Sequence, residues 1–79
     1  MKEIYYALLE QHTMKTSSEI NDTMTFRQDL GMDSLRIAML YPEIEDSFNI
    51  RFSPLDDDLG EIFKTVGTLW RFIESRGSF

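Results

Sequence analysis

The chain of 79 residues contains no cysteine, and this absence limits how so small a fold can be stabilised. Neither a disulfide framework nor a thiolate metal site is available to replace a hydrophobic core. A domain of this size buries only somewhat more than about 60% of its unfolded surface, so its core must be compact and simple. Hydrophobic residues make up 42% of the chain, which is enough for such a core. We therefore expect one domain, residues 1–79, without a roomy enclosed active site.

The spacing of apolar residues predicts a helix at each end of the chain. The first is expected from Lys2 to about Met14, and the last from Val66 to about Gly77. Their apolar stripes consist of Ile4, Tyr5, Leu8, Leu9 and His12 in the first helix, and of Val66, Leu69, Trp70 and Ile73 in the last.

Residues 15–31 are rich in Thr, Ser, Asn and Asp and have no apolar period, so they predict a long loop. Its isolated apolar side chains are expected to pin the loop to the core; they are Ile20, Met24, Phe26 and Leu30.

A second helix is expected to begin at Asp33 or Ser34, which are good N-cap types, and to end near Asn49. Pro42 lies inside it without an N–H, which predicts a kink or break at Tyr41–Pro42. The predicted apolar stripe is Leu35, Ala38, Met39, Ile44 and Phe48.

Residues 50–52 alternate like a strand but have no partner strand, so an extended link is expected that buries Ile50 or Phe52. After Pro54, the three aspartates at 56–58 favour the N-terminal end of a short third helix that reaches Ile62 and Phe63. The predicted fold is thus an all-α four-helix bundle, with three longer helices, one short third helix and a long loop between the first two.

Fourteen acidic residues against eight Lys and Arg give a net charge of −6, which excludes nucleic acid as a favoured partner. The acidity either keeps the domain soluble or steers it towards basic patches on other proteins. The N-terminus lacks a signal-peptide pattern, and no apolar run approaches the about 20 residues that span a bilayer. We therefore expect a cytoplasmic monomer without a membrane span.

One segment, residues 29–35, places a serine at the start of a helix directly after a glycine turn. The N–H groups and dipole of a helix start favour a bound or covalently attached phosphate. Asp33 beside Ser34 suits a divalent metal that brings in a phosphate donor. The alternative is that Asp33 and Ser34 are ordinary helix caps.

The segment Leu30–Leu35 resembles the Leu-Gly-x-Asp-Ser-Leu signature of acyl carrier proteins. Phe26–Leu30 is similar to that family's lead-in to the signature, and Glu45–Ile50 to the acidic-Phe-Gly-apolar end of its second helix. Thr65–Gly67 resembles the Thr-Val-x start of its last helix. The resemblance extends over about residues 26–73. Apart from the lead-in, which adjoins the signature, it has three spaced matches in the right order.

This resemblance implies that Ser34 carries 4'-phosphopantetheine, donated from coenzyme A by a phosphopantetheinyl transferase with magnesium, and that Asp33 assists. It implies a carrier that is not an enzyme and has no resident metal. Acyl groups would be held as thioesters and delivered to acyl-transferring and chain-extending enzymes of fatty-acid, polyketide or related biosynthesis. Because the chain has no thiol of its own, the arm would supply one.

The second helix is expected to provide the partner-binding surface, against the alternative of a solvated helix face. Its candidate residues are Leu35, Arg36, Met39, Glu43, Glu45 and Asp46. Arg36 departs from the family, many members of which have an acidic residue there, and this favours different partners. Four residues are expected either to line a shelter for the cargo or simply to pack in the core: Ala38, Met39, Leu69 and Ile73.

Three other functions remain open. Carriers of aminoacyl or peptidyl groups more often show Gly-Gly-x-Ser-Leu, whereas Met32-Asp33 here favours acyl cargo. An unmodified helical interaction module would keep the bundle without the arm. A hydrolase would need His12, the only histidine, to reach Ser34 from another helix, and no nucleophile elbow is evident.

Overall fold

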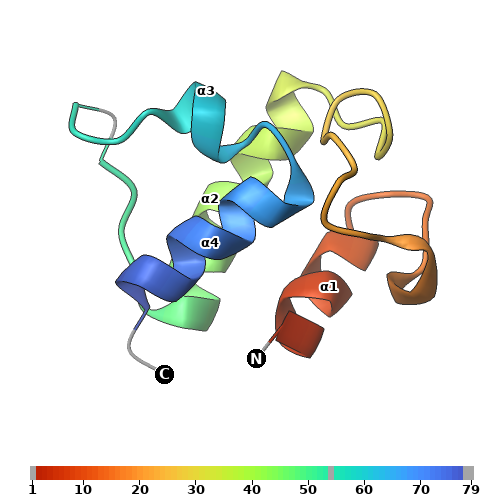
Figure 1. Ribbon diagram of the computed structural model, residues 1–79, viewed down its shortest axis with the longest axis horizontal. Helices are drawn as coiled ribbons and strands as arrows, with labels where there is room; N and C mark the ends of the chain where they lie inside the picture. Colours follow the sequence, from red (N-terminus) through yellow and green to blue (C-terminus); the bar gives the residue numbers. More distant parts are fainter. Residues whose placement is uncertain (1, 54, 78–79) are drawn as a thin grey trace.

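The computed structural model describes residues 2–53 and 55–77, and its regular structure is helical. The elements are α1 (Lys2–Glu10), the 3-10 helix η1 (Ser17–Glu19), α2 (Ser34–Phe48), α3 (Leu59–Ile62) and α4 (Val66–Arg76). In Figure 1, α4 lies across α2, α1 lies to the right of both, and α3 lies at the top. The predicted all-α bundle is confirmed, with helices of nine, fifteen and eleven residues and one of four.

The first helix is shorter than predicted, because it ends at Glu10 instead of Met14. After Glu10 the backbone tightens: the N–H of Gln11 donates to the carbonyl of Leu8, and that of His12 to the carbonyl of Leu9. Thr13 then donates its hydroxyl to the carbonyl of Leu30 at 2.9 Å, which ties the chain after α1 to the turn before α2.

Of the five residues predicted for the stripe of the first helix, three are confirmed and Ile4 is wrong, while His12 lies beyond the end of α1 with its side chain 9% exposed. Tyr5, Leu8 and Leu9 are buried, whereas Ile4 is 47% exposed. The hydroxyl of Tyr5 donates to the carbonyl of Val66 at 2.7 Å, so this residue joins α1 to the start of α4.

The long loop between α1 and α2 is confirmed, and it contributes to the core as predicted. Ile20, Phe26 and Leu30 are buried, and Met24 packs half-buried against the same cluster. Met32, which was not among the predicted core residues, is also buried. Buried side chains therefore anchor the loop to the core as far as the residue before Asp33.

The predicted apolar stripe of α2 is wrong in its first half. Leu35 is 72% and Met39 48% exposed, and Ala38 is exposed as well. At 3.6 residues per turn, Leu35 and Ile44 lie on opposite sides of the helix, so one stripe cannot contain both. The buried residues of the helix share one face instead: Ile37, Leu40, Ile44 and Phe48.

Of the predicted kink or break at Tyr41–Pro42, the break is wrong, because α2 runs through Pro42 as one helix. A kink there stays a prediction. Pro42 and Ala38, whose carbonyl loses its helical partner, are both exposed. Water can therefore reach the carbonyl that the missing N–H leaves without a helical bond. The predicted end of the helix is confirmed: Asn49 adopts a left-handed conformation (φ 54°) as its C-cap.

The link after α2 buries Ile50 and leaves Phe52 half-buried, as predicted. The third helix begins later than expected, at Leu59, because only Asp58 among the three aspartates caps it, by accepting from the N–H of Glu61. Asp57 instead accepts from Arg76 at 2.6 Å, which ties this turn to the end of α4. Pro54 lies outside the described residues.

Asp22 connects three parts of the fold. Its carboxylate accepts hydrogen bonds of 2.6 Å from Lys2 and from Tyr6 on α1, and its carbonyl accepts from the N–H of Gly67 on α4. The hydrogen bond from Lys2, followed by that from Tyr6, lowers the pKa of Asp22. Burial, together with this hydrogen bond, raises the pKa of Tyr6 to about 12.

An Asp22→Asn variant is expected to be less stable than the wild type at pH 7 by up to about 1 kcal/mol, since these contacts are partly exposed. A carboxyl with a lowered folded pKa contributes stability above its unfolded pKa, near about 3.9, and loses it as the pH falls through the folded pKa. Urea unfolding at pH 7 and at pH values below about 4 measures this, and the difference between the variants should shrink in acid. An undiminished difference would contradict the assignment.

Candidate functional site

The site is built around Ser34, the first residue of α2, which is exposed. Gly31 precedes it with φ 66°, a left-handed conformation that favours glycine. Leu30 and Met32 on either side of Gly31 are 4% and 2% exposed, so the turn is anchored in the core. The fold therefore holds a serine hydroxyl at the solvent-facing start of a helix.

Asp33 acts as the N-cap of α2. Its backbone is extended (φ −88°, ψ 179°), and its Oδ1 accepts from the N–H of Arg36 at 2.9 Å. This is the helix-cap role that the sequence left open as an alternative. A role for Asp33 in receiving the arm stays a prediction. Within residues 2–53 and 55–77, no three His, Asp or Glu side chains form a group that can hold a metal ion.

Arg27 completes the surroundings of the serine. Its Nη2 donates to Ser34 Oγ at 2.9 Å. Residues 25–30 form a tight turn, in which the N–H groups of Asp29 and Leu30 both donate to the carbonyl of Thr25, and this turn brings Arg27 back to the start of α2. Sequence reasoning missed Arg27, because its position in the lead-in segment gave no sign that it would meet Ser34.

The six predicted partner-binding residues fall into two groups. Leu35, Arg36, Met39 and Asp46 are exposed on α2. Glu43 and Glu45 are half-buried and make hydrogen bonds within the chain. Oε2 of Glu43 lies 2.6 Å from Nε2 of His12, and Oε2 of Glu45 accepts from the N–H of Phe52 at 2.9 Å. Leu35, Met39 and Asp46 share one helix face by their spacing.

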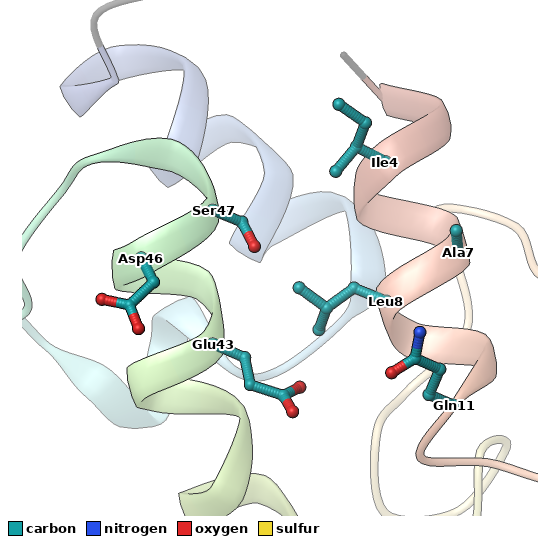
Figure 2. Close-up of a pocket in the computed structure, with 7 residues that line it drawn as sticks. All are labelled: Ile4, Ala7, Leu8, Gln11, Glu43, Asp46 and Ser47. Carbon is teal, nitrogen blue, oxygen red and sulfur yellow. The ribbon is translucent and has the colours of Figure 1, made fainter.

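A groove of about 460 Å³ lies between α1 and the second half of α2, away from Ser34 (Figure 2). Ile4, Ala7 and Leu8 line its α1 side together with Gln11, and Glu43, Asp46 and Ser47 line its α2 side.

None of the four residues considered for sheltering cargo lines this groove. Leu69 and Ile73 are fully buried in the core, which is the core-packing alternative. Ala38 and Met39 face solvent instead, so neither interpretation holds for them.

The geometry does not assemble a hydrolytic triad. His12 is bound to Glu43, and the side-chain partner of Ser34 is Arg27, a cation that does not act as a base. An exposed serine at a helix start with an arginine beside it instead suits attachment of a phosphate-containing group. The class of protein that this fold and site define is a small helical carrier.

Comparison with known proteins agrees with that class. The family model described as phosphopantetheine attachment site matches residues 7–73. A protein named Acyl carrier protein from Exiguobacterium sibiricum is 40% identical over 62 residues, which cover 78% of this chain and 75% of the relative. An Acyl carrier protein from another Exiguobacterium strain is 36% identical over 62 residues, which again cover 78% of this chain and 75% of the relative. The chain belongs to the family of proteins with a phosphopantetheine attachment site.

The predicted cofactor, 4'-phosphopantetheine, is the group that this family attaches, and members of the family are carriers and not enzymes. The site fits the group: Ser34 is exposed, a side-chain carbon built at Gly31 would meet nothing within 4 Å, and Arg27 supplies a cation. When attached, the group supplies a terminal thiol, which a chain without cysteine lacks. Over the part of the chain that the structure describes, the helices are too short and too polar to cross a membrane.

Proposed function

We propose that this chain is an acyl carrier protein in which Ser34 receives the 4'-phosphopantetheine arm. The position of Ser34 carries the proposal, since its hydroxyl is exposed at the start of α2 in a turn anchored by buried neighbours. During attachment, Ser34 Oγ forms a bond to the phosphorus of coenzyme A next to the pantetheine. The phosphoanhydride bond breaks, the nucleotide half leaves, and the hydroxyl proton passes to solvent.

The acyl cargo would be held as a thioester on the arm and delivered to acyl-transferring and chain-extending enzymes of fatty-acid, polyketide or related biosynthesis. The similarity to two proteins named Acyl carrier protein supports this. The carrier would act as a cytoplasmic monomer, and its first partner would be the phosphopantetheinyl transferase. Asp33, which caps the helix through one oxygen, would assist at the transferase through the other.

The exposed side of α2 would meet these partners. Leu35 and Met39 offer apolar contact at 72% and 48% exposure, and Asp46 adds an exposed carboxylate. Arg36 gives the first turn of this surface a positive charge, so a partner with an acidic group at that point is favoured. Glu43 and Glu45 would contribute mainly to the local field, because both are held by contacts within the chain.

Intact-mass measurement after incubation with coenzyme A, magnesium and a phosphopantetheinyl transferase tests the proposal. We expect the mass to rise by one phosphopantetheine group, and fragmentation should place it on the peptide that contains Ser34. An unchanged mass would instead identify an unmodified interaction module. Modification at another residue would contradict the assignment of the site.

Loading experiments separate acyl cargo from the aminoacyl or peptidyl alternative. The holo-protein is incubated with an acyl-transferring enzyme and an acyl donor, or with an adenylating enzyme, ATP and an amino acid. Thioester formation with the acyl donor alone is expected, in line with Met32-Asp33 in place of a glycine pair. Loading by the amino acid alone would favour the alternative.

A further inference from the structure

We propose that Arg27 is the phosphate-binding residue of the arm: its guanidinium pairs with the phosphodiester that joins the arm to Ser34. The inference rests on the proposed attachment at Ser34. It concerns a residue of the loop, outside the Asp-Ser-Leu segment and outside the exposed face of α2.

The distance between the two side chains is the first observation. Arg27 Nη2 lies 2.9 Å from Ser34 Oγ. After attachment, the phosphorus is bonded to this same oxygen. The two non-bridging oxygens of the phosphodiester, which share its one negative charge, lie only one bond beyond the phosphorus. A guanidinium that already reaches Oγ therefore needs only a small side-chain rotation to reach them. Its planar fork suits two parallel hydrogen bonds to a phosphate.

The group that accepts the hydrogen bond from Arg27 changes when the arm is attached to Ser34. In the unmodified protein the arginine meets a neutral hydroxyl. In the modified protein it meets an anion, and charge-assisted hydrogen bonds are roughly twice as strong as neutral ones. Attachment of the arm therefore strengthens the contact instead of displacing it.

The backbone beneath Arg27 is fixed, which limits the entropy lost when the contact forms. Phe26, its neighbour, is fully buried, and the carbonyl of Phe26 accepts from the N–H of Met32 at 2.9 Å. Leu30 closes the turn by donating its N–H to the carbonyl of Thr25 at 3.1 Å. Arg27 thus extends from an anchored turn towards an anchored helix start.

Arg27 places a positive charge directly beside Ser34, although the chain as a whole carries −6 and Asp29 and Asp33 lie nearby in the sequence. The carboxylate of Asp29 is engaged within its own turn by the N–H of Thr25 at 2.8 Å, and that of Asp33 by the N–H of Arg36. Arg27 is exposed, so its positive charge is available to a group attached at Ser34.

Phosphorus and nitrogen NMR of the modified protein tests the inference. The wild type is compared with Arg27→Gln, with Arg27→Lys, and with Arg51→Gln as a control that removes the same charge. Arg51 has an 80% exposed side chain and follows the far end of α2, a helix of fifteen residues or about 22 Å. Before the comparison, circular dichroism verifies that each variant is folded.

We expect the phosphorus resonance to shift in Arg27→Gln, to move part of the way back in Arg27→Lys, and to stay at the wild-type position in Arg51→Gln. In the wild type, the Nε–H signal of Arg27 should move when the arm is attached. This last readout needs no variant, so it holds even where the transferase modifies a variant slowly.

The outcomes separate the two proposals. An unchanged Arg27 Nε–H signal, with equal phosphorus shifts in the wild type and Arg27→Gln, would overturn the role of Arg27 while leaving attachment at Ser34 intact. Absence of any mass gain on the wild type would overturn attachment itself, and with it the inference drawn here.

Discussion

A Ser34→Ala variant is expected to gain no mass when it is incubated with coenzyme A, magnesium and a phosphopantetheinyl transferase, whereas the wild type is converted fully. The variant lacks the oxygen that forms the bond to phosphorus. The substitution should leave the fold intact, because Ser34 is exposed and the hydrogen bond to its hydroxyl within residues 2–53 and 55–77 comes from the exposed side chain of Arg27. Exposed substitutions of this kind usually change the free energy of unfolding by no more than about 0.5 kcal/mol.

Ser47→Ala is the matched control for this experiment. Ser47 is also an exposed serine of α2, but it lies near the C-terminal end of the helix, on the groove beside α1. We expect full modification of Ser47→Ala, because only a serine at the helix start combines an accessible hydroxyl with the anchored turn at Gly31. Equal mass gain in Ser34→Ala and wild type would contradict the assignment of Ser34 as the attachment site.

The sequence was sufficient to predict the turn and the helix start around Ser34, because that information is local. The left-handed turn favours glycine at position 31, and the cap of α2 favours aspartate at position 33. Ser34 follows directly. A cap and the turn before it depend on neighbouring residues, so a short motif specifies them. The end of α2 at Asn49 was predictable for the same reason.

The inward face of α2 was harder to predict because apolar residues occur on both of its sides. Leu35 and Met39 are as hydrophobic as Leu40 and Ile44, and the sequence does not say which pair faces the core. Packing against α1 and α4 decides this, with Leu40 and Ile44 fully buried. The apolar residues left outside, Leu35 and Met39, are the ones proposed for contact with a partner.

Arg27 and Glu43 show the limit of motif reasoning in the candidate site. Arg27 meets Ser34 across a loop turn, and Glu43 meets His12 across 31 residues of sequence. Such contacts depend on how the loop and α1 pack against α2. In the sequence, Arg27 is one of several charged residues of the loop. Its position beside Ser34 is seen only in the tertiary structure.

The loop that carries Arg27 leads to the second large effect that we expect. Phe26→Ala should lower the free energy of unfolding by about 3–5 kcal/mol, because a fully buried phenylalanine is removed and leaves a cavity. Its ring lies 5.8 Å from that of Phe63, so the substitution also loosens the loop from the segment before α4. At about 0.05–0.15 kcal/mol per residue, a domain of 79 residues has only about 4–12 kcal/mol in total.

Urea unfolding followed by circular dichroism measures this loss, with Leu35→Ala as the control. Leu35 is a large apolar residue close to the same site, but it is 72% exposed, so its removal should cost no more than about 0.5 kcal/mol. If Phe26→Ala does not fold, Phe26→Leu retains most of the buried volume and should show a smaller loss in the same direction. Equal stabilities of Phe26→Leu and wild type would contradict the anchoring role of Phe26. A loss of stability in the Phe26 variants means that the loop holding Arg27 beside Ser34 is anchored by the hydrophobic core.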